Sequence, residues 1–301
     1  MRIENIKNIC IGLVLLTISV SGCVKDISIP QPDYTERATI QCSLEPGVVP
    51  KLYLYKTVPY FDVVDTRELF IKDAIITIST DDYTDNLVID STYNYIKCEY
   101  EYFFRGFFPV IPNKKYNLTV LSNGKTITAA TNTNLPTVII DSIGYTDQFK
   151  DIYGEHEGVI PYFHDIPNQS NYYRYEMTRE VDTTMKYREG KLHSPCIGAG
   201  SVTVLEIGRS VYNDINASGE QMRLIIEPSY SHKEGLPGQI RVETLDKVTY
   251  DFFNQLDKQK LGQTNPFVEP IFLTNGQFGK DALGYFGCIT RSAPVLFIFP
   301  E

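Results

Sequence analysis

Residues 116–129 have the sequence YNLTVLSNGKTITA, and this stretch decides the fold class. Tyr116, Leu118 and Val120 alternate with polar neighbours, and the same alternation resumes after Asn123-Gly124. A period of two is typical of a strand that buries one face. Asn-Gly between two such runs is the strongest short-range signal for a β-hairpin. The stretch therefore predicts two antiparallel strands joined at Asn123-Gly124.

The same alternation recurs throughout the first half of the chain, between segments rich in turn residues. Its apolar positions are Ala38, Ile40, Cys42 and Leu44, then Leu52 and Leu54, then Ala74, Ile76 and Ile78. Short, regularly spaced strands of this kind favour a β-sandwich. We predict an immunoglobulin-like β-sandwich over residues 34–136, closing near Leu135-Pro136.

The second half, residues 137–301, is predicted to be a second β-rich domain, either a sandwich or an open barrel. Its expected strands are Val138–Tyr145, Gly158–Phe163, Asn171–Met177, Val202–Ile207, Met222–Glu227 and Val295–Phe299. One amphipathic helix is expected near residues 245–260, because apolar side chains recur there at spacings of three and four. They are Leu245, Val248, Phe252, Phe253 and Leu256. Gly262 and Pro266 should end this helix, which would seal one face or end of the sheet.

Composition supports a β-rich protein and argues against a nucleic-acid partner. The chain has 21 Tyr and 16 Phe, and aromatic residues favour strands. Its net charge is −9, whereas phosphate binding depends on clustered Lys and Arg. We therefore expect no nucleic-acid partner.

The first 22 residues have the pattern of a lipoprotein signal peptide. Arg2 and Lys7 precede an apolar run over residues 9–20 that is too short to span a bilayer, which takes roughly 20 residues. Small residues then lead to Cys23, so we predict cleavage between Gly22 and Cys23 and acylation of the Cys23 thiol. The alternatives are an ordinary secretory signal with a chance cysteine, or an uncleaved anchor helix.

A lipidated Cys23 would hold the protein at a membrane that it does not cross, because more than one acyl chain gives stable attachment. Residues 23–33 contain Pro30 and Pro32 and are predicted to form an extended tether. Lys25-Asp26 partly matches an export tag of Bacteroidota lipoproteins, which favours the cell-surface face of the outer membrane over the periplasmic face.

Four other cysteines remain in the mature chain: Cys42, Cys98, Cys196 and Cys288. An exported protein can oxidise them, and four cysteines allow three pairings. Cys42 lies at an inward position of an alternating strand. We leave two interpretations open, a buried free thiol at Cys42 and a Cys42–Cys98 disulfide.

Motifs for catalysis or metal binding are not found in the sequence. There is no Gly-x-Ser-x-Gly, and Gly198-Ala199-Gly200-Ser201 is predicted to be an ordinary loop. The four histidines lack metal-ligand spacing, and Asp81-Asp82 are adjacent in a turn rather than opposed across a cleft. We therefore predict no catalytic residues, no metal site, no cofactor and no enzymatic activity.

Aromatic residues give the remaining functional signal. Tyr100 and Tyr102 precede a cluster that comprises Phe103, Phe104, Arg105, Phe107 and Phe108. Exposed aromatic rings beside an arginine are typical of binding hot spots, so this cluster is a candidate interface. The alternative is that the tyrosines face the core and the phenylalanines pack under the second domain. Carbohydrate binding is disfavoured by the absence of Trp, although Tyr can also stack on sugars.

Several segments in order resemble a family of Bacteroidota outer-membrane lipoproteins known as domain of unknown function 4249. They are Thr57–Phe61, Asp73-Ala74, Tyr116–Leu118 with Gly124, Asp165 with Asn171–Arg174, Asn265–Phe267 with Glu269-Pro270, and Gly284–Gly287 as a closing turn. The chain departs from the family pattern at 279–283. The resemblance implies a two-domain lipoprotein whose genes often neighbour those of TonB-dependent outer-membrane transporters, and it implies no established activity.

These observations lead to a functional hypothesis. We expect a non-enzymatic outer-membrane lipoprotein that docks on a TonB-dependent transporter and helps to capture an unknown small nutrient, peptide or glycan. The alternatives are a surface hydrolase whose catalytic residues meet only in the fold, and a structural or adhesive surface protein.

Overall fold

A computed structural model describes the chain from residue 34 to residue 300. The described part excludes residues 60–64, 152–153, 183–185, 188–189, 192–195, 197–200, 209–210, 216, 228–236, 265–272 and 274–275. The predicted signal peptide, the cleavage site at Gly22 and Cys23, and the tether all lie outside it. Glu36–Glu301 forms one compact unit. In its described residues, no helix is both long and apolar enough to cross a membrane.

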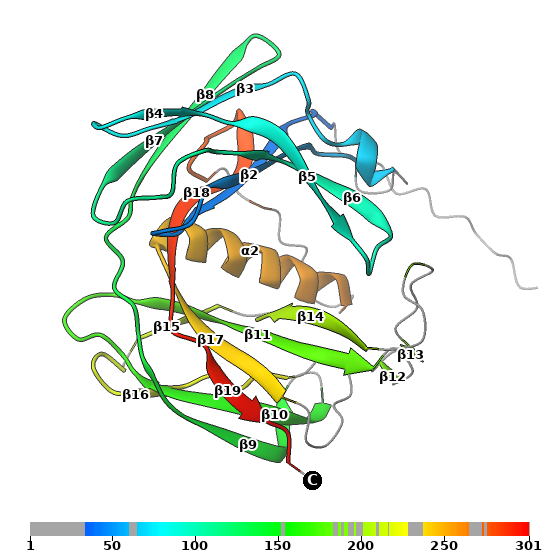
Figure 1. Cartoon of the computed structure of the whole chain (residues 1–301), viewed down its shortest axis with the longest axis vertical. Coiled ribbons are helices and arrows are strands. Elements are labelled where there is room, and N and C mark those ends of the chain that lie inside the picture. The colour runs from blue at the N-terminus through cyan, green and yellow to red at the C-terminus, as the bar shows by residue number, and fades with distance from the viewer. Residues whose placement is uncertain are drawn as a thin grey trace, which may run out of the picture. The chain divides into compact units, whose positions relative to one another are not determined.

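A ten-stranded sheet lies at the centre of this unit (Figure 1). Eight strands follow one another in the order β14-β11-β17-β18-β1-β2-β6-β5, while β15 pairs with β11 and β19 with β17. Their bounds are β1 Ala38–Leu44, β2 Lys51–Lys56, β5 Val88–Asn94, β6 Glu99–Arg105, β11 Tyr172–Asp182, β14 Ser201–Ile207, β15 Tyr212–Asn213, β17 Pro237–Leu245, β18 Ala282–Arg291 and β19 Val295–Ile298. The protein is mainly β, as predicted.

Three smaller sheets complete the strands of the described part. One has the order β4-β3-β7-β8, the second β16-β10-β9, and the third pairs β12 with β13. Their bounds are β3 Ile75–Ser79, β4 Thr84–Asn86, β7 Lys115–Ser122, β8 Lys125–Asn132, β9 Ile140–Asp151, β10 Gly154–His164, β12 Lys186–Tyr187, β13 Gly190–Lys191 and β16 Gln221–Arg223.

Two hydrophobic cores form against one face of the central sheet. In the first, Ile40 and Leu54 of the central sheet pack with Ile76 and Leu118 of the four-stranded sheet. In the second, Met177 and Val242 pack with Val159 and Phe163 of β10. Alternate residues of one strand point to one face, so the period of two seen in the sequence separates these buried positions from the opposite face.

The predicted hairpin is confirmed. Ser122 pairs with Lys125, and the two residues between them have positive φ values, 50° at Asn123 and 71° at Gly124. Positive φ at both central residues matches the right-handed twist of the flanking strands, which is why Asn-Gly is favoured there.

The C-terminal part of the chain adds a strand beside β1 in the central sheet. β18 runs parallel to β1, with Gly284 beside Ile40 and Phe286 beside Cys42. The interpretation of Gly284–Gly287 as a closing turn is therefore wrong, because these residues lie within a strand. The central strand β17 was also not predicted, although its buried residues Ile240 and Val242 alternate with the less buried Gln239 and Arg241.

The proposed division into two domains at residue 136 stays a prediction. The second core consists of residues from Val138 onward, close to that boundary. The first core, however, includes Phe278, Ala282 and Phe286 from the end of the chain. The two halves therefore share one continuous sheet.

A helix lies on the other face of the central sheet. α2 spans Lys247–Thr264, and the three-residue 3₁₀ helix η1 spans Thr66–Glu68. Asp246 caps α2 by accepting a hydrogen bond from the Thr249 amide at 2.9 Å. Phe252 and Phe253 pack on Tyr285 of β18, with ring centres 5.1 and 5.3 Å away. The helix predicted near 245–260 is confirmed, but two of its details were wrong. Leu245 belongs to β17, and Gly262 lies within α2 rather than ending it.

Candidate functional site

The site begins where β2 changes its pairing partner. At its start, β2 pairs with β6: the Gly106 amide donates to the Pro50 carbonyl at 3.0 Å, and Leu52 lies opposite Phe104. Two residues later, the Leu54 carbonyl accepts from the amide of Ile71 instead, at 3.1 Å. Strands β2 and β6 therefore separate, and a space opens between them.

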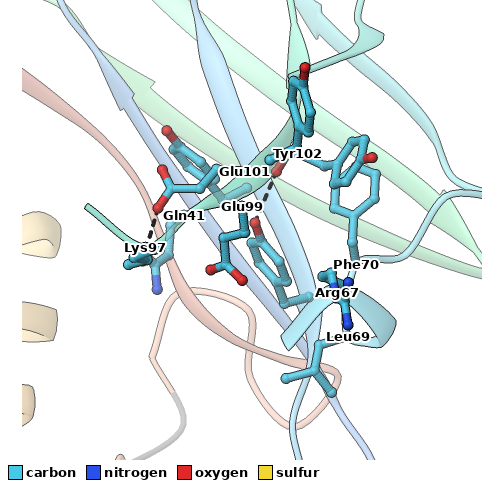
Figure 2. A pocket seen from close by; sticks show the side chains of 11 residues that line it. Gln41, Arg67, Leu69, Phe70, Lys97, Glu99, Glu101 and Tyr102 are labelled. Carbon is cyan, nitrogen blue, oxygen red and sulfur yellow. Dashed lines mark hydrogen bonds and ion pairs between the residues drawn. The ribbon is translucent and has the colours of Figure 1, made fainter. Parts of the chain in front are cut away.

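A cavity of about 360 Å³ occupies this space (Figure 2). Aromatic rings form much of its wall, and charged side chains lie among them. In the view of Figure 2, Lys97 and Glu101 lie on one side and Arg67, Leu69 and Phe70 on the other. The lining residues are Gln41, Tyr53, Tyr55, Arg67, Leu69, Phe70, Lys97, Glu99, Tyr100, Glu101 and Tyr102.

Hydrogen bonds hold the aromatic wall in place. The Tyr55 hydroxyl donates to the Tyr102 carbonyl at 2.9 Å. Phe70 packs on Tyr55 and Tyr102, with ring centres 5.8 and 5.7 Å away. Burial, together with the neighbouring Tyr53 and Glu101, raises the pKa of Tyr55 to about 12, so this hydroxyl remains a donor at neutral pH.

The charges in this cavity are paired within the protein. Lys97 Nζ lies 2.8 Å from Glu101 Oε1, and Asn94 Nδ2 lies 2.9 Å from the same oxygen. Burial acts to raise the pKa of Glu101, but these two hydrogen bonds outweigh it and hold that pKa below its ordinary value. At neutral pH the cavity therefore presents a paired cation and anion.

A second cavity, of about 550 Å³, adjoins the first and shares Gln41 and Tyr53 with it. It lies on the same side of the sheet as α2 and contains a second group of charged side chains. The lining residues are Gln41, Ser43, Glu45, Val48, Val49, Lys51, Tyr53, Arg174, Ile207, Gly208, Phe253, Asp257, Tyr285, Ile289 and Arg291. We call the two adjoining cavities together the groove.

Arg291 organises the charges behind the second cavity. Its guanidinium forms ion pairs with Glu45, with Glu176 at 2.7 Å and with Glu243 at 2.9 Å. Arg174 also pairs with the fully buried Glu243, at 2.7 Å. Burial opposes the charge on Arg291, but the three carboxylates raise its pKa above the ordinary value. This network fixes the guanidinium groups of Arg174 and Arg291, which line the second cavity.

The structure separates the predicted interface residues into two groups. Phe103 and Phe104 are buried, each 2% exposed, whereas Phe107 and Phe108 are 62% and 50% exposed. Including Phe103 and Phe104 in an exposed interface was therefore wrong. Arg105 is exposed, and its Nη1 lies 3.6 Å from Asp90 Oδ2.

Both faces of β6 are covered at this point, which explains the burial of two consecutive residues. Phe104 enters the first core, where its ring centre lies 5.4 Å from that of Phe70. Phe103 points to the opposite face and packs against Tyr53, while the Lys51 ammonium lies 4.5 Å from its ring centre. The sequence shows the aromatic cluster but not the second covering layer.

The exposed pair Phe107 and Phe108 lies on a well-defined turn. Their amides donate to Asp85 Oδ2 at 2.8 and 3.2 Å. At Gly106 an added Cβ would lie 2.5 Å from the same oxygen, so a side chain there would disturb the turn. The backbone that carries the two exposed rings is therefore held in place.

The disulfide links Cys98 to Cys196, with their Cα atoms 5.6 Å apart. The Cys42–Cys98 pairing is therefore wrong, and Cys42 is a buried free thiol in the first core, as is Cys288 in its own strand. Sequence could not identify the partner, because Cys196 comes close only through the tertiary fold. The bond anchors the end of the β5–β6 hairpin, next to Lys97 and Glu99 of the groove.

Within the described residues, no three His, Cys, Asp or Glu side chains gather as a metal site would require. His164 Nδ1 lies 2.7 Å from Asp141 Oδ2 at the surface, and Lys114 pairs with Asp82 at 2.7 Å. Gly198-Ala199-Gly200 and most of the other candidate histidines lie outside the described part.

The groove residues Tyr53 and Tyr55 were not predicted as a site. They alternate with the buried Leu52 and Leu54, so the pattern of β2 shows that they occupy the opposite face. That signal was available, but it does not show that a second set of rings from β6 faces them.

Fold and groove together define a class: a mainly β protein with a central sheet, two cores on one face and an aromatic groove on the other. The chain belongs to the family described as domain of unknown function DUF4249, whose model matches residues 24–293. No curated protein matches the chain.

Proposed function

We propose that the protein is a non-enzymatic, lipid-anchored binding subunit of the outer membrane that works with a TonB-dependent transporter. The observation that carries this proposal is the groove, in which two adjoining cavities combine aromatic rings with fixed polar groups. Binding pockets typically have apolar and aromatic walls with a few oriented polar groups. The ligand would be a small nutrient, a peptide or a glycan.

The rings of the groove suit ligand binding. Tyr53 and Tyr55 are nearly parallel, with an interplanar angle of 13° and ring centres 6.5 Å apart. Tyrosine combines a flat apolar face with a polar hydroxyl, so it can contact a ligand that is partly apolar and partly polar. The ion pairs around these rings keep the wall ordered before a ligand arrives, which reduces the entropy cost of binding.

The anchor is tested by labelling cells with palmitate. We expect label in the wild-type protein and none in Cys23→Ala, which should leave the membrane fraction. Protease treatment of intact cells then tests the surface location. A Cys23→Ala protein that fractionates like the wild type would refute the lipid anchor.

Transporter docking is tested at the exposed turn of Phe107 and Phe108. Replacing both with Ser should leave folding intact, because both rings are at least half exposed, and should reduce recovery of a transporter barrel from native membranes. Phe104→Ser is the contrasting variant, since it removes a buried ring and should cost about 3–5 kcal/mol of stability. If wild-type protein recovers no barrel from native membranes, the transporter association is wrong.

Ligand binding is tested with pools of oligosaccharides and peptides and a thermal-shift measurement. Tyr53→Ala should abolish any shift, whereas Tyr34→Ala, outside the groove, should not change it. A shift that persists fully in Tyr53→Ala would place the ligand elsewhere.

A further inference from the structure

One edge of β6 faces the first cavity. β5 pairs with β6 along its whole length, from Glu99 to Arg105. On the other side, β2 pairs with β6 only through Lys51–Arg105 and Leu52–Phe104. Among the described residues, no strand pairs with Tyr100 or Tyr102 on that side.

The direction of the backbone groups follows from the hydrogen bonds already present. The Gly106 amide points to β2, where it donates to Pro50, and in a strand every second residue points its amide and carbonyl to the same side. Phe104, Tyr102 and Tyr100 therefore face the same way as Gly106. The Tyr102 carbonyl confirms this direction, because it accepts the hydroxyl of Tyr55.

This open edge lines the cavity. Tyr100 and Tyr102 both belong to its wall, and Tyr53 and Phe70 lie on its other sides. An unpaired strand edge is a template for another extended chain. Here it is bordered by aromatic rings, so a chain added to the edge would also place its side chains against apolar surface.

We infer that the cavity holds an extended peptide segment by strand addition to β6, at the amides of Tyr100 and Tyr102 and the carbonyl of Tyr100. The Tyr102 carbonyl already accepts the hydroxyl of Tyr55. The inference rests on the proposed binding function and names its ligand class. In strand addition the main-chain hydrogen bonds supply affinity, and pockets for alternate side chains supply specificity. A glycan has no regular series of N–H and C=O groups to match this edge.

The surrounding charges fit a peptide of mixed composition. Lys97 and Glu101 are paired at 2.8 Å, and Arg67 pairs with Asp65. Because cations and anions both border the cavity, neither sign of ligand charge is strongly excluded. The strand is also held at its start, where Cys98 is linked to Cys196. The edge is therefore fixed before the peptide binds.

The test uses the mature full-length chain and a tryptic digest of casein as the peptide pool. Peptides retained after gel filtration are sequenced by mass spectrometry, and the best one is synthesised with a methyl group on each backbone nitrogen in turn. We expect alternate positions to lose about tenfold in affinity, the effect of one lost hydrogen bond, and the positions between them to change little. Hydrogen exchange of the Tyr100 and Tyr102 amides should slow when the peptide is bound.

A matched pair of variants tests the edge from the protein side. Tyr100→Pro removes the amide that faces the cavity, and proline is tolerated at an open strand edge. Tyr100→Ala keeps that amide and removes only the ring. The proline variant should bind about tenfold more weakly than the alanine variant. If Tyr100→Pro does not fold, the methylation series and hydrogen exchange still decide.

Three results would overturn the inference: an even response to methylation, unchanged exchange at Tyr100 and Tyr102, or no retained peptide. If an oligosaccharide pool such as a xylan digest binds instead, the peptide inference fails while the proposed binding function stands. If neither pool binds and no transporter is recovered, the proposed function fails as well.

Discussion

Replacing Gly284 with Ala should disrupt the pairing of β18 with β1, which links the two halves of the chain. Gly284 lies in β18 beside Ile40 of β1 and has a φ of +109°. An added Cβ would lie 1.8 Å from the carbonyl oxygen of Ile40 and 2.7 Å from its carbonyl carbon. These are backbone atoms of a central strand, so they cannot rotate away as a side chain would.

Two costs add in this variant. Holding a non-glycine residue at such a φ costs about 1–3 kcal/mol. Forcing extra volume into a packed interior costs about 1–3 kcal/mol more. We therefore expect a loss of about 2–6 kcal/mol, which is a large part of the stability of an ordinary domain, about 5–15 kcal/mol.

Urea unfolding followed by circular dichroism measures this loss, and Gly124→Ala is the matched control. Gly124 also has a positive φ, +71°, but no atom lies within 4 Å of the position of its Cβ. The control should lose only the conformational cost, about 1–2 kcal/mol. If both variants lose the same amount, contact with β1 does not limit residue 284 and the parallel β1–β18 pairing is wrong.

Two further predictions follow from the cysteines and the buried charges. Reducing the Cys98–Cys196 bond should lower the free energy of unfolding by about 2–4 kcal/mol. Alkylation of the reduced, folded protein should label those two thiols but spare the buried Cys42. An unchanged unfolding midpoint would contradict the predicted loss. Burial, opposed by Arg291, raises the pKa of Glu45. The Glu45 carboxyl therefore ionises at a lower pH in the unfolded chain than in the folded protein. As the pH rises above the ordinary carboxyl pKa, this difference lowers the stability of the folded state. Glu45→Gln should gain stability relative to wild type as the pH rises above about 4, the ordinary carboxyl pKa, and parallel pH curves would contradict it.

Local features of the fold could be predicted because they depend on neighbours in sequence. The Asn123-Gly124 hairpin needs only a positive φ at two residues between alternating runs. The helix over Lys247–Thr264 follows from the spacing of its apolar residues. The alternation in β1 and β2 similarly showed which side chains enter the core.

The candidate site could be predicted only in fragments. The aromatic cluster around Phe103–Phe108 was visible, but its buried and exposed members could not be separated, because that depends on which layers cover β6. The alternation of Leu52 and Leu54 implies that Tyr53 and Tyr55 lie on the opposite face of β2, but they were not predicted as a site. The hydrogen bond between Tyr55 and Tyr102 forms because β2 and β6 separate after Leu52 in β2 and before Phe104 in β6.

The sequence by itself determined the strand-rich class, the hairpin, the helix and the pattern of a lipoprotein signal, since each depends on composition or on residues close together in the chain. Only the tertiary structure decided that β18 lies beside β1, that Cys98 joins Cys196, and that β2 leaves β6 to open a cavity. The physical reason is that strand pairing joins distant segments through backbone groups that every residue carries. Side-chain patterns show which face of a strand is buried, but they do not show which strand lies beside it.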